Sequence, residues 1–396
     1  MNRKEEARVD AGGVPLPTRL VDGYHVHRAA LARDLDVLSL PRQVLLAGTE
    51  ATVPSQVSFT HGVPEASGLS AVTFAQDQRL TRALLERAQV PKPAGASFSW
   101  RSISKAEKWA SNLGFPVLVR EGVGENPARA IRQLNSAEEL RAAFNQLRRR
   151  DKADRTPGSN PHIAGYATTR LTFTYDEEGN EVAPLRSRML VEEDPFGRAI
   201  RGFVLGGRLI TAVELDGDRN TGVREVTEEL DPEVIDVLVK AAEAVPGLAC
   251  ATVDVLDERS GPARGPLVMS VAERPRIETY LSAKHSLGDL IGDALLEFQA
   301  REANIALGTS RTSLKRHMEI EGLRHAAEAA DQLPNIAENY GAEISIDNAD
   351  AVTGDVEATA TGSPEVLAAL AELLMAGELL RDRAAAVNYS KGPSID

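Results

Sequence analysis

The stretch that decides the fold runs from Phe74 to Ile131. It begins FAQDQRLTRALLERAQVPKPAGASFSW, continues through a helical segment, and ends NLGFPVLVREGVGENPARAI. Its first part predicts an amphipathic helix over 78–89, which ends at the prolines that follow. The apolar face of this helix is expected to consist of Leu80, Leu84, Leu85 and Ala88. The second part predicts a strand followed by a glycine-containing loop.

This order of elements resembles the ATP-grasp family, whose corresponding text has an Asp-Lys pair, a helix, a "GVPVP" turn, and "PVVVKP" before a glycine-rich loop. The resemblance covers roughly residues 60–300 and is closest to peptide-forming members such as cyanophycin synthetase and glutathione ligases. It implies an α+β, two-lobed ATP-grasp-like fold with ATP and Mg²⁺ as cofactors. It also implies that a carboxylate is activated as an acyl phosphate, which an amine then attacks.

The segment LVEEDPFGRAIRGFVLGG, residues 190–207, matches the spacing of the family's adenine hinge. The resemblance implies that Glu192 and Glu193 flank adenine and that Arg201 lies near the reacting phosphoryl group. A surface arginine on a strand is the alternative for Arg201. Ala199 stands where the family has a carboxylate for the ribose, so a ribose hydroxyl would lose its acceptor.

The positions that imply magnesium ligands lie in ATVDVLD and LVMSVAERPRI. The first supplies Asp254. In the second, the Arg-Pro dipeptide sets a register in which Ser270 and Ala272 replace the family's glutamate and asparagine. Sliding the register by three residues would bring in Glu273, but a shift by an odd number turns the side chains to the opposite face. Asp254 and Glu273 are the metal candidates, and a water-exposed carboxylate at a strand end is the alternative for Asp254.

The positions implied for the phosphates are changed as well. Gln78 stands where the family's first lysine belongs and Arg120 where the second does. Arginine keeps the charge and can bind phosphate in bidentate fashion. The following loop carries Glu125, which repels phosphate, and Pro127, which has no N–H to donate. Arg129 is expected to compensate in part.

The 396 residues predict two or three domains. We expect an N-terminal region over 1–75, an ATP-grasp-like nucleotide-binding region over 76–303, and a C-terminal helix-hairpin-helix module over 304–396 whose first helix spans 314–331. Residues 319–396 hold fifteen acidic and four basic residues, a net charge of −11 out of −13 for the whole chain. This acidity argues against nucleic acid as a partner and leaves dimerisation or packing as the expected role of the module.

Other features narrow the class of protein. The single cysteine, Cys250, excludes an internal disulfide and favours a reducing, cytoplasmic location. We expect neither a secretory signal nor a membrane-spanning helix. His25 and His27, interpreted as a pair on one face of a strand, and His61 have no partner at zinc-ligand spacing.

The replacements at Gln78, Ala199, Ser270 and Ala272, together with the acidic loop, favour a catalytically impaired ATP-grasp relative, a pseudoenzyme. It would act by binding or by assembly, as a homo-oligomer or with another protein. A second hypothesis is an active ligase that joins a small-molecule or peptide carboxylate to an amine, using Arg120, Arg201, Asp254 and Glu273. A third is a purely structural component without nucleotide binding.

Overall fold

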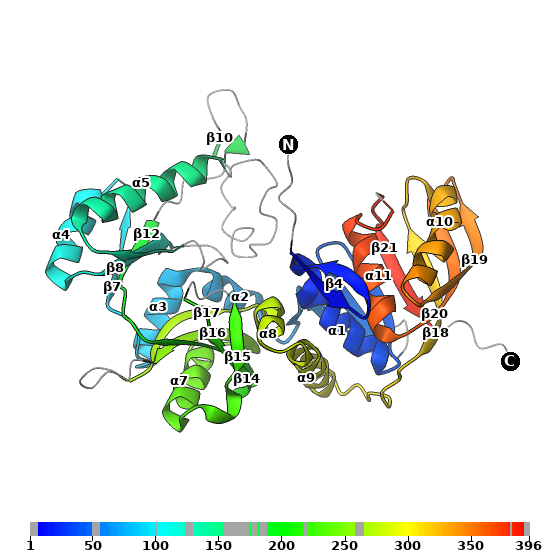
Figure 1. Cartoon of the computed structure of the whole chain (residues 1–396), viewed down its shortest axis with the longest axis horizontal. Coiled ribbons are helices and arrows are strands. Elements are labelled where there is room, and N and C mark those ends of the chain that lie inside the picture. Colours follow the sequence, from blue (N-terminus) through cyan, green and yellow to red (C-terminus); the bar gives the residue numbers. More distant parts are fainter. Residues whose placement is uncertain are drawn as a thin grey trace. The chain divides into compact units, whose positions relative to one another are not determined.

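The structure is a computed structural model of the whole chain (Figure 1). It describes residues 7–49, 56–99, 101–122, 130–153, 174–175, 181–182, 188–217, 221–257, 265–380 and 382–391, with the side chains of 148–153, 174–175, 181–182 and 188 left out. The fold is α+β, with helices packed on mainly antiparallel sheets, and the class expected from the sequence is confirmed.

The chain divides into two compact units. Unit 2 is the continuous segment 67–273, whereas unit 1 is built from both ends of the chain, 1–66 and 274–396. The expected boundaries at 75/76 and 303/304 differ from this division. The physical reason is that strands from the two ends of the chain pair with each other in one sheet.

The larger sheet of unit 2 has five antiparallel strands in the order β15-β14-β13-β16-β17. The elements are β13 (Arg198–Leu205), β14 (Arg208–Leu215), β15 (Gly222–Glu225), η3 (Thr227–Glu229), α7 (Pro232–Glu243), β16 (Cys250–Asp257) and β17 (Leu267–Ala272). β13 and β14 form a hairpin whose two-residue turn is Gly206-Gly207. Both glycines adopt positive φ, as a two-residue hairpin turn requires.

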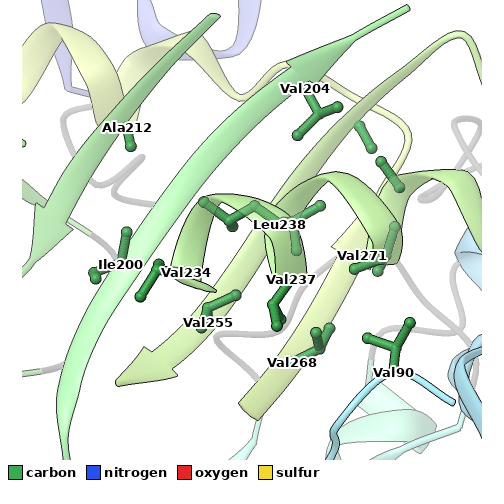
Figure 2. Packing of buried hydrophobic residues seen from close by; sticks show 14 of the residues in the cluster. Val90, Ile200, Val204, Ala212, Val234, Val237, Leu238, Val255, Val268 and Val271 are labelled. Carbon is green, nitrogen blue, oxygen red and sulfur yellow. The ribbon is translucent and has the colours of Figure 1, made fainter. Parts of the chain in front are cut away.

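One face of this sheet packs against α7 (Figure 2). Proline occupies the first position of α7, where a backbone N–H would have no acceptor within the helix, so its missing N–H costs nothing. Val234, Val237 and Leu238 of α7 meet valines and an isoleucine from the strands. Because side chains alternate along a strand, the next residues on β13, β16 and β17 lie on the opposite face of the sheet.

The smaller sheet of unit 2 has four antiparallel strands in the order β7-β12-β8-β9. The elements are β7 (Gly95–Ser99), α4 (Ile103–Leu113), β8 (Val117–Glu121), β9 (Ile131–Leu134), α5 (Ala137–Ala153) and β12 (Arg188–Glu193), with the short pair β10 (Thr174–Tyr175) and β11 (Glu181–Val182) between α5 and β12. Its second core lies between one face of the sheet and α4 and α5. Unit 2 thus has two lobes, and α2 (Leu69–Gln76) and α3 (Gln78–Arg87) precede them in the chain.

Unit 1 contains an eight-stranded sheet in the order β19-β20-β18-β21-β3-β4-β5-β6. Its elements are β1 (Arg8–Ala11), β2 (Val14–Pro17), η1 (Thr18–Leu20), α1 (Val21–Ala32), β3 (Asp36–Leu40), β4 (Val44–Gly48), β5 (Gln56–Thr60), β6 (Val63–Pro64), α8 (Ile277–Ala283), α9 (Ser286–Glu302), β18 (Leu314–Glu321), α10 (Ala326–Asn339), β19 (Glu343–Asp350), β20 (Asp355–Gly362), α11 (Pro364–Ala376) and β21 (Ala386–Ser390). β21, near the C-terminus, pairs with β3, near the N-terminus.

Two predictions about helices are wrong. The helix expected over 314–331 is strand β18 followed by α10, because Met318 and Ile320 alternate with polar residues and fill the core of the sheet. In α3 the buried face holds Gln78, Thr81, Arg82 and Leu85, while Leu80 is 40% exposed. The polar residues of α3 are buried because they have partners, and periodicity alone does not reveal partners.

His25 and His27 lie on helix α1, so their interpretation as a strand pair is wrong. Both are buried. His25 Nδ1 lies 3.2 Å from Asp289 Oδ1 of α9, and its ring packs where Gly288 has no side chain. In the part of the chain that the structure describes, every helix is too short or too polar to cross a membrane.

The free energy of unfolding of the protein should decrease as the pH falls below 6.5, the ordinary pKa of a histidine side chain. Burial lowers the pKa of His25 from 6.5; Asp289 and Asp22 oppose this effect and Arg28 adds to it. The unfolded chain therefore takes up the proton first as the pH falls, which favours unfolding. Urea titrations at about pH 7.5 and about pH 5.5 measure the free energy of unfolding at each pH. The decrease in this free energy between the two pH values should be smaller for His25→Gln than for the parent. Equal losses in both proteins would show that the burial of His25 is not the cause.

Candidate functional site

The five-stranded sheet brings several predicted site residues onto one face, opposite α7. In the ladder, Arg201 of β13 pairs with Asp254 of β16, and Asp254 pairs with Ser270 of β17. Directly paired residues point to the same side of a sheet. The face, called here the Arg201 face, includes Ala199, Arg201, Thr252, Asp254, Ser270 and Ala272.

Arg201 and Asp254 form a bidentate ion pair. Arg201 Nε donates to Asp254 Oδ1 at 2.6 Å and Nη2 donates to Oδ2 at 3.0 Å. The Ser270 hydroxyl adds a third bond, to Asp254 Oδ2, at 2.8 Å. The guanidinium is buried, with 3% of the Arg201 side chain exposed, and this fork geometry is the strong form of the interaction. Both oxygens of the candidate metal ligand are thus bound by protein donors.

Glu273, the other candidate metal ligand, follows the end of β17. Its Oε1 accepts a hydrogen bond of 2.8 Å from Gln76 Nε2, and its carbonyl accepts one from the Cys250 thiol. It lies three positions after Ser270, roughly 10 Å along an extended chain. The ladder therefore places Ser270, and not Glu273, opposite Asp254.

The four-stranded sheet carries the second group, on the face opposite α4 and α5. This face, called here the Arg120 face, includes Gly95, Ser97, Leu118, Arg120, Leu190 and Glu192. Glu192 is completely buried and is bound by two arginines. Arg120 Nη2 donates to Oε2 at 2.7 Å, and Arg82 of α3 donates to Oε1 at 2.5 Å and to Oε2 at 3.1 Å.

The electrostatics of this cluster follow from its burial. Burial raises the pKa of Glu192, but the charges and hydrogen bonds of Arg120 and Arg82 outweigh it, so the pKa lies below its usual value. Burial lowers the pKa of Arg120, and Glu192 opposes that effect. The cluster holds two positive charges and one negative charge, away from water.

Some polar atoms near this cluster have no hydrogen-bond partner among the described residues. They are Ser97 Oγ, Gln78 Oε1 and Arg120 Nε. Ser97 and Arg120 both pair with Leu190, so they occupy one row of the Arg120 face. Buried polar atoms of this kind are usually satisfied by water or a ligand.

The other predicted residues are placed as follows. Glu193 ends β12 and its N–H donates to the Ala94 carbonyl. Ala199 is buried on the Arg201 face. Arg129, with most of its loop, lies outside the described residues.

The residues present do not fit the magnesium and phosphate roles that the resemblance implies. The oxygens of Asp254 accept from Arg201 and Ser270, and Glu273 is bound to Gln76. Among the described residues, no group of three or more His, Cys, Asp or Glu side chains could hold a metal ion. Arg120, the candidate phosphate ligand, is already bound to Glu192.

Arg82 is a site residue that was not predicted from the sequence. It lies one helical turn after Gln78, on the same face of α3, and is buried. The signal that could have found it is a cation four residues after Gln78, the position where the resemblance implies a lysine.

No protein-family model and no curated protein matches the chain. Solved structures similar to it include a D-alanine–D-alanine ligase from Bacillus anthracis, with 14% identity, a TM-score of 0.41, and coverage of 60% of this chain and 71% of the other. The ATP-grasp ligase PsnB, complexed with precursor peptide PsnA2 and AMPPNP, shares 15% identity with a TM-score of 0.39, over 59% and 61% of the chains.

An N5-carboxyaminoimidazole synthase from Aspergillus clavatus, in complex with ADP and 5-aminoimidazole ribonucleotide, is 15% identical with a TM-score of 0.41. The alignment covers 76% of this chain and 72% of the synthase. These values describe a partial likeness of fold, and no activity follows from them.

Proposed function

We propose that the chain is a divergent ATP-grasp-type protein that no longer ligates a carboxylate to an amine and acts by binding or assembly. The observation that carries the proposal is the ion pair between Arg201 and Asp254. The candidate catalytic cation and the candidate metal carboxylate neutralise each other on one face of the sheet.

The physical argument concerns competition for the carboxylate. Mg²⁺ takes near-octahedral oxygen ligands and keeps several waters, so a protein carboxylate that binds it must offer a free oxygen. Two guanidinium bonds and the Ser270 hydroxyl occupy the oxygens of Asp254. A metal would compete with a buried arginine for these oxygens, and a displaced arginine would lose its counter-charge.

A binding role is favoured over a purely structural one by the row that holds Ser97 and Arg120. Its two unsatisfied atoms, Ser97 Oγ and Arg120 Nε, together with Gln78 Oε1, offer donors and an acceptor to a small polar ligand. Such groups are costly when they stay without partners.

The proposal is tested by phosphate release from Mg-ATP with mixed amino acids and peptides as carboxylates and amines. We expect release at the level of the buffer blank, while an active D-alanine–D-alanine ligase serves as the positive control. Release that depends on a carboxylate and an amine, with an amide product, would establish the active-ligase alternative.

Thermal melting separates binding from a purely structural role. A ligand that binds only the native state raises the melting midpoint. Any shift that ATP produces should be the same with Mg²⁺ and with EDTA, because the metal candidates are bound within the protein. An unchanged midpoint over a range of nucleotides would instead favour the structural component.

A further inference from the structure

Strand β17 contains an irregular residue beside the buried ion cluster. The ladder between β16 and β17 shifts its register so that Met269 has no partner, which is a β-bulge. The Met269 carbonyl accepts hydrogen bonds from Arg82 Nη2 at 2.8 Å and from Arg120 Nη2 at 3.2 Å. The Val268 carbonyl accepts one from Arg82 Nη1 at 2.9 Å.

These bonds connect the two sheets of unit 2. Arg120 and Glu192 belong to the four-stranded sheet, and the two carbonyls belong to the edge strand of the five-stranded sheet. Arg82 comes from α3 and contacts both sides, through Glu192 and through Val268 and Met269.

We propose that Arg82, Glu192 and Arg120 form a clasp that holds the four-stranded and five-stranded sheets of unit 2 in one closed arrangement. Glu192 aligns both guanidinium groups, and the bulge aims two carbonyls at them. Opening the sheets would separate the arginines from those carbonyls, which would leave buried acceptors without donors until water entered. This inference does not depend on the nucleotide-related proposal above.

Gly95 makes room for the clasp. It is paired with Glu192 across β7 and β12. A Cβ atom at position 95 would lie 2.9 Å from Glu192 Cγ. Glu192 cannot swing aside freely, because both of its carboxylate oxygens are bound by arginine. Any side chain at position 95 therefore pushes the carboxylate out of alignment without removing a charge.

The experiment measures the distance between the lobes in the full chain by pulsed electron spin resonance. Spin labels are placed at Ser111→Cys on α4 and Glu243→Cys on α7, both exposed positions. The parent with only its buried Cys250 serves as the labelling blank. We expect one narrow distance distribution in the otherwise unchanged chain.

The clasp is removed by the triple variant Arg82→Met/Arg120→Met/Glu192→Met. Replacing a whole buried ion cluster by apolar side chains of similar volume often preserves stability, so this variant should fold. We expect a broader distribution that extends to longer distances. Amide exchange in β17 should also accelerate about tenfold or more, as the loss of hydrogen bonds to charged groups implies. A folded triple variant with the parent's narrow distribution would overturn the proposal.

Gly95→Ala is the second test and keeps every charge. It should broaden the distance distribution in the same direction. Gly217→Ala is its matched control, because no atom lies within 4 Å of a Cβ there, and it should leave the distribution unchanged. A narrow distribution in Gly95→Ala, or equal broadening in both variants, would contradict the clasp.

Discussion

Replacing Glu192 by glutamine should lower the free energy of unfolding by about 3–5 kcal/mol, the cost of breaking a buried ion pair from one side. The substitution keeps the shape of the side chain, so a cavity does not contribute. Arg82 and Arg120 would remain buried without their counter-charge. The measurement is urea-induced unfolding, followed by circular dichroism.

The pH dependence of this difference provides its own check. Because the pKa of Glu192 is lowered from 4.5 in the folded protein, the stabilisation is fully present above 4.5. It is lost as the pH falls from there through the folded-state value. The gap between parent and variant should therefore shrink in acid.

The exposed Glu228→Gln in the same unit is the control, with an expected change within about 0.5 kcal/mol. A Glu192→Gln effect as small as that of the control would mean that the arginines find other partners.

The second large effect is expected in the core between α7 and the five-stranded sheet (Figure 2). Leu238→Ala should cost about 2–5 kcal/mol, because Leu238 is fully buried and its removal leaves a cavity. Leu80→Ala makes the same change on α3, where the side chain is 40% exposed, and should cost far less. Comparable losses in the two variants would contradict this packing.

Gly202 of β13 allows a sharper test of the same contact. A Cβ at position 202 would lie 2.9 Å from Leu238 Cδ1 and 3.0 Å from Leu209 Cδ1. Gly202→Ala alone should cost about 1–3 kcal/mol by overpacking. In the Leu238→Ala background its cost should fall, because the added methyl enters the space that was vacated. Strict additivity in the double-mutant cycle would show that the two positions are not in contact.

Much of the local structure followed from the chain alone. The Gly206-Gly207 hairpin was predictable because two glycines supply the positive φ that the turn needs. Helix α11 was predictable as well, since Ser363 caps it, Pro364 starts it and Gly377 ends it in the left-handed conformation. These signals lie within a few residues of the structure that they determine.

The division of the chain into its two units could not be predicted from local sequence signals. β21 pairs with β3, and the chain between them includes all of unit 2. The C-terminal segment was expected to form a separate module because it has its own helix-hairpin-helix pattern and most of the net negative charge of the chain. No local sequence signal indicates that its last strand, β21, pairs with the N-terminal strand β3, because this pairing depends on complementary faces that lie far apart in the chain.

The candidate site also depends on contacts between residues far apart in the chain, which the local sequence does not determine. From its residue types we expected the positions that the resemblance implies for ribose, metal and phosphate to be altered. Only the tertiary structure decided that Arg201 binds Asp254, 53 residues away, and that Arg82 binds Glu192, 110 residues away. The sequence does not show which opposite charge a charged side chain will contact. Burial removes the competing water, and the fold then decides which opposite charge lies within reach.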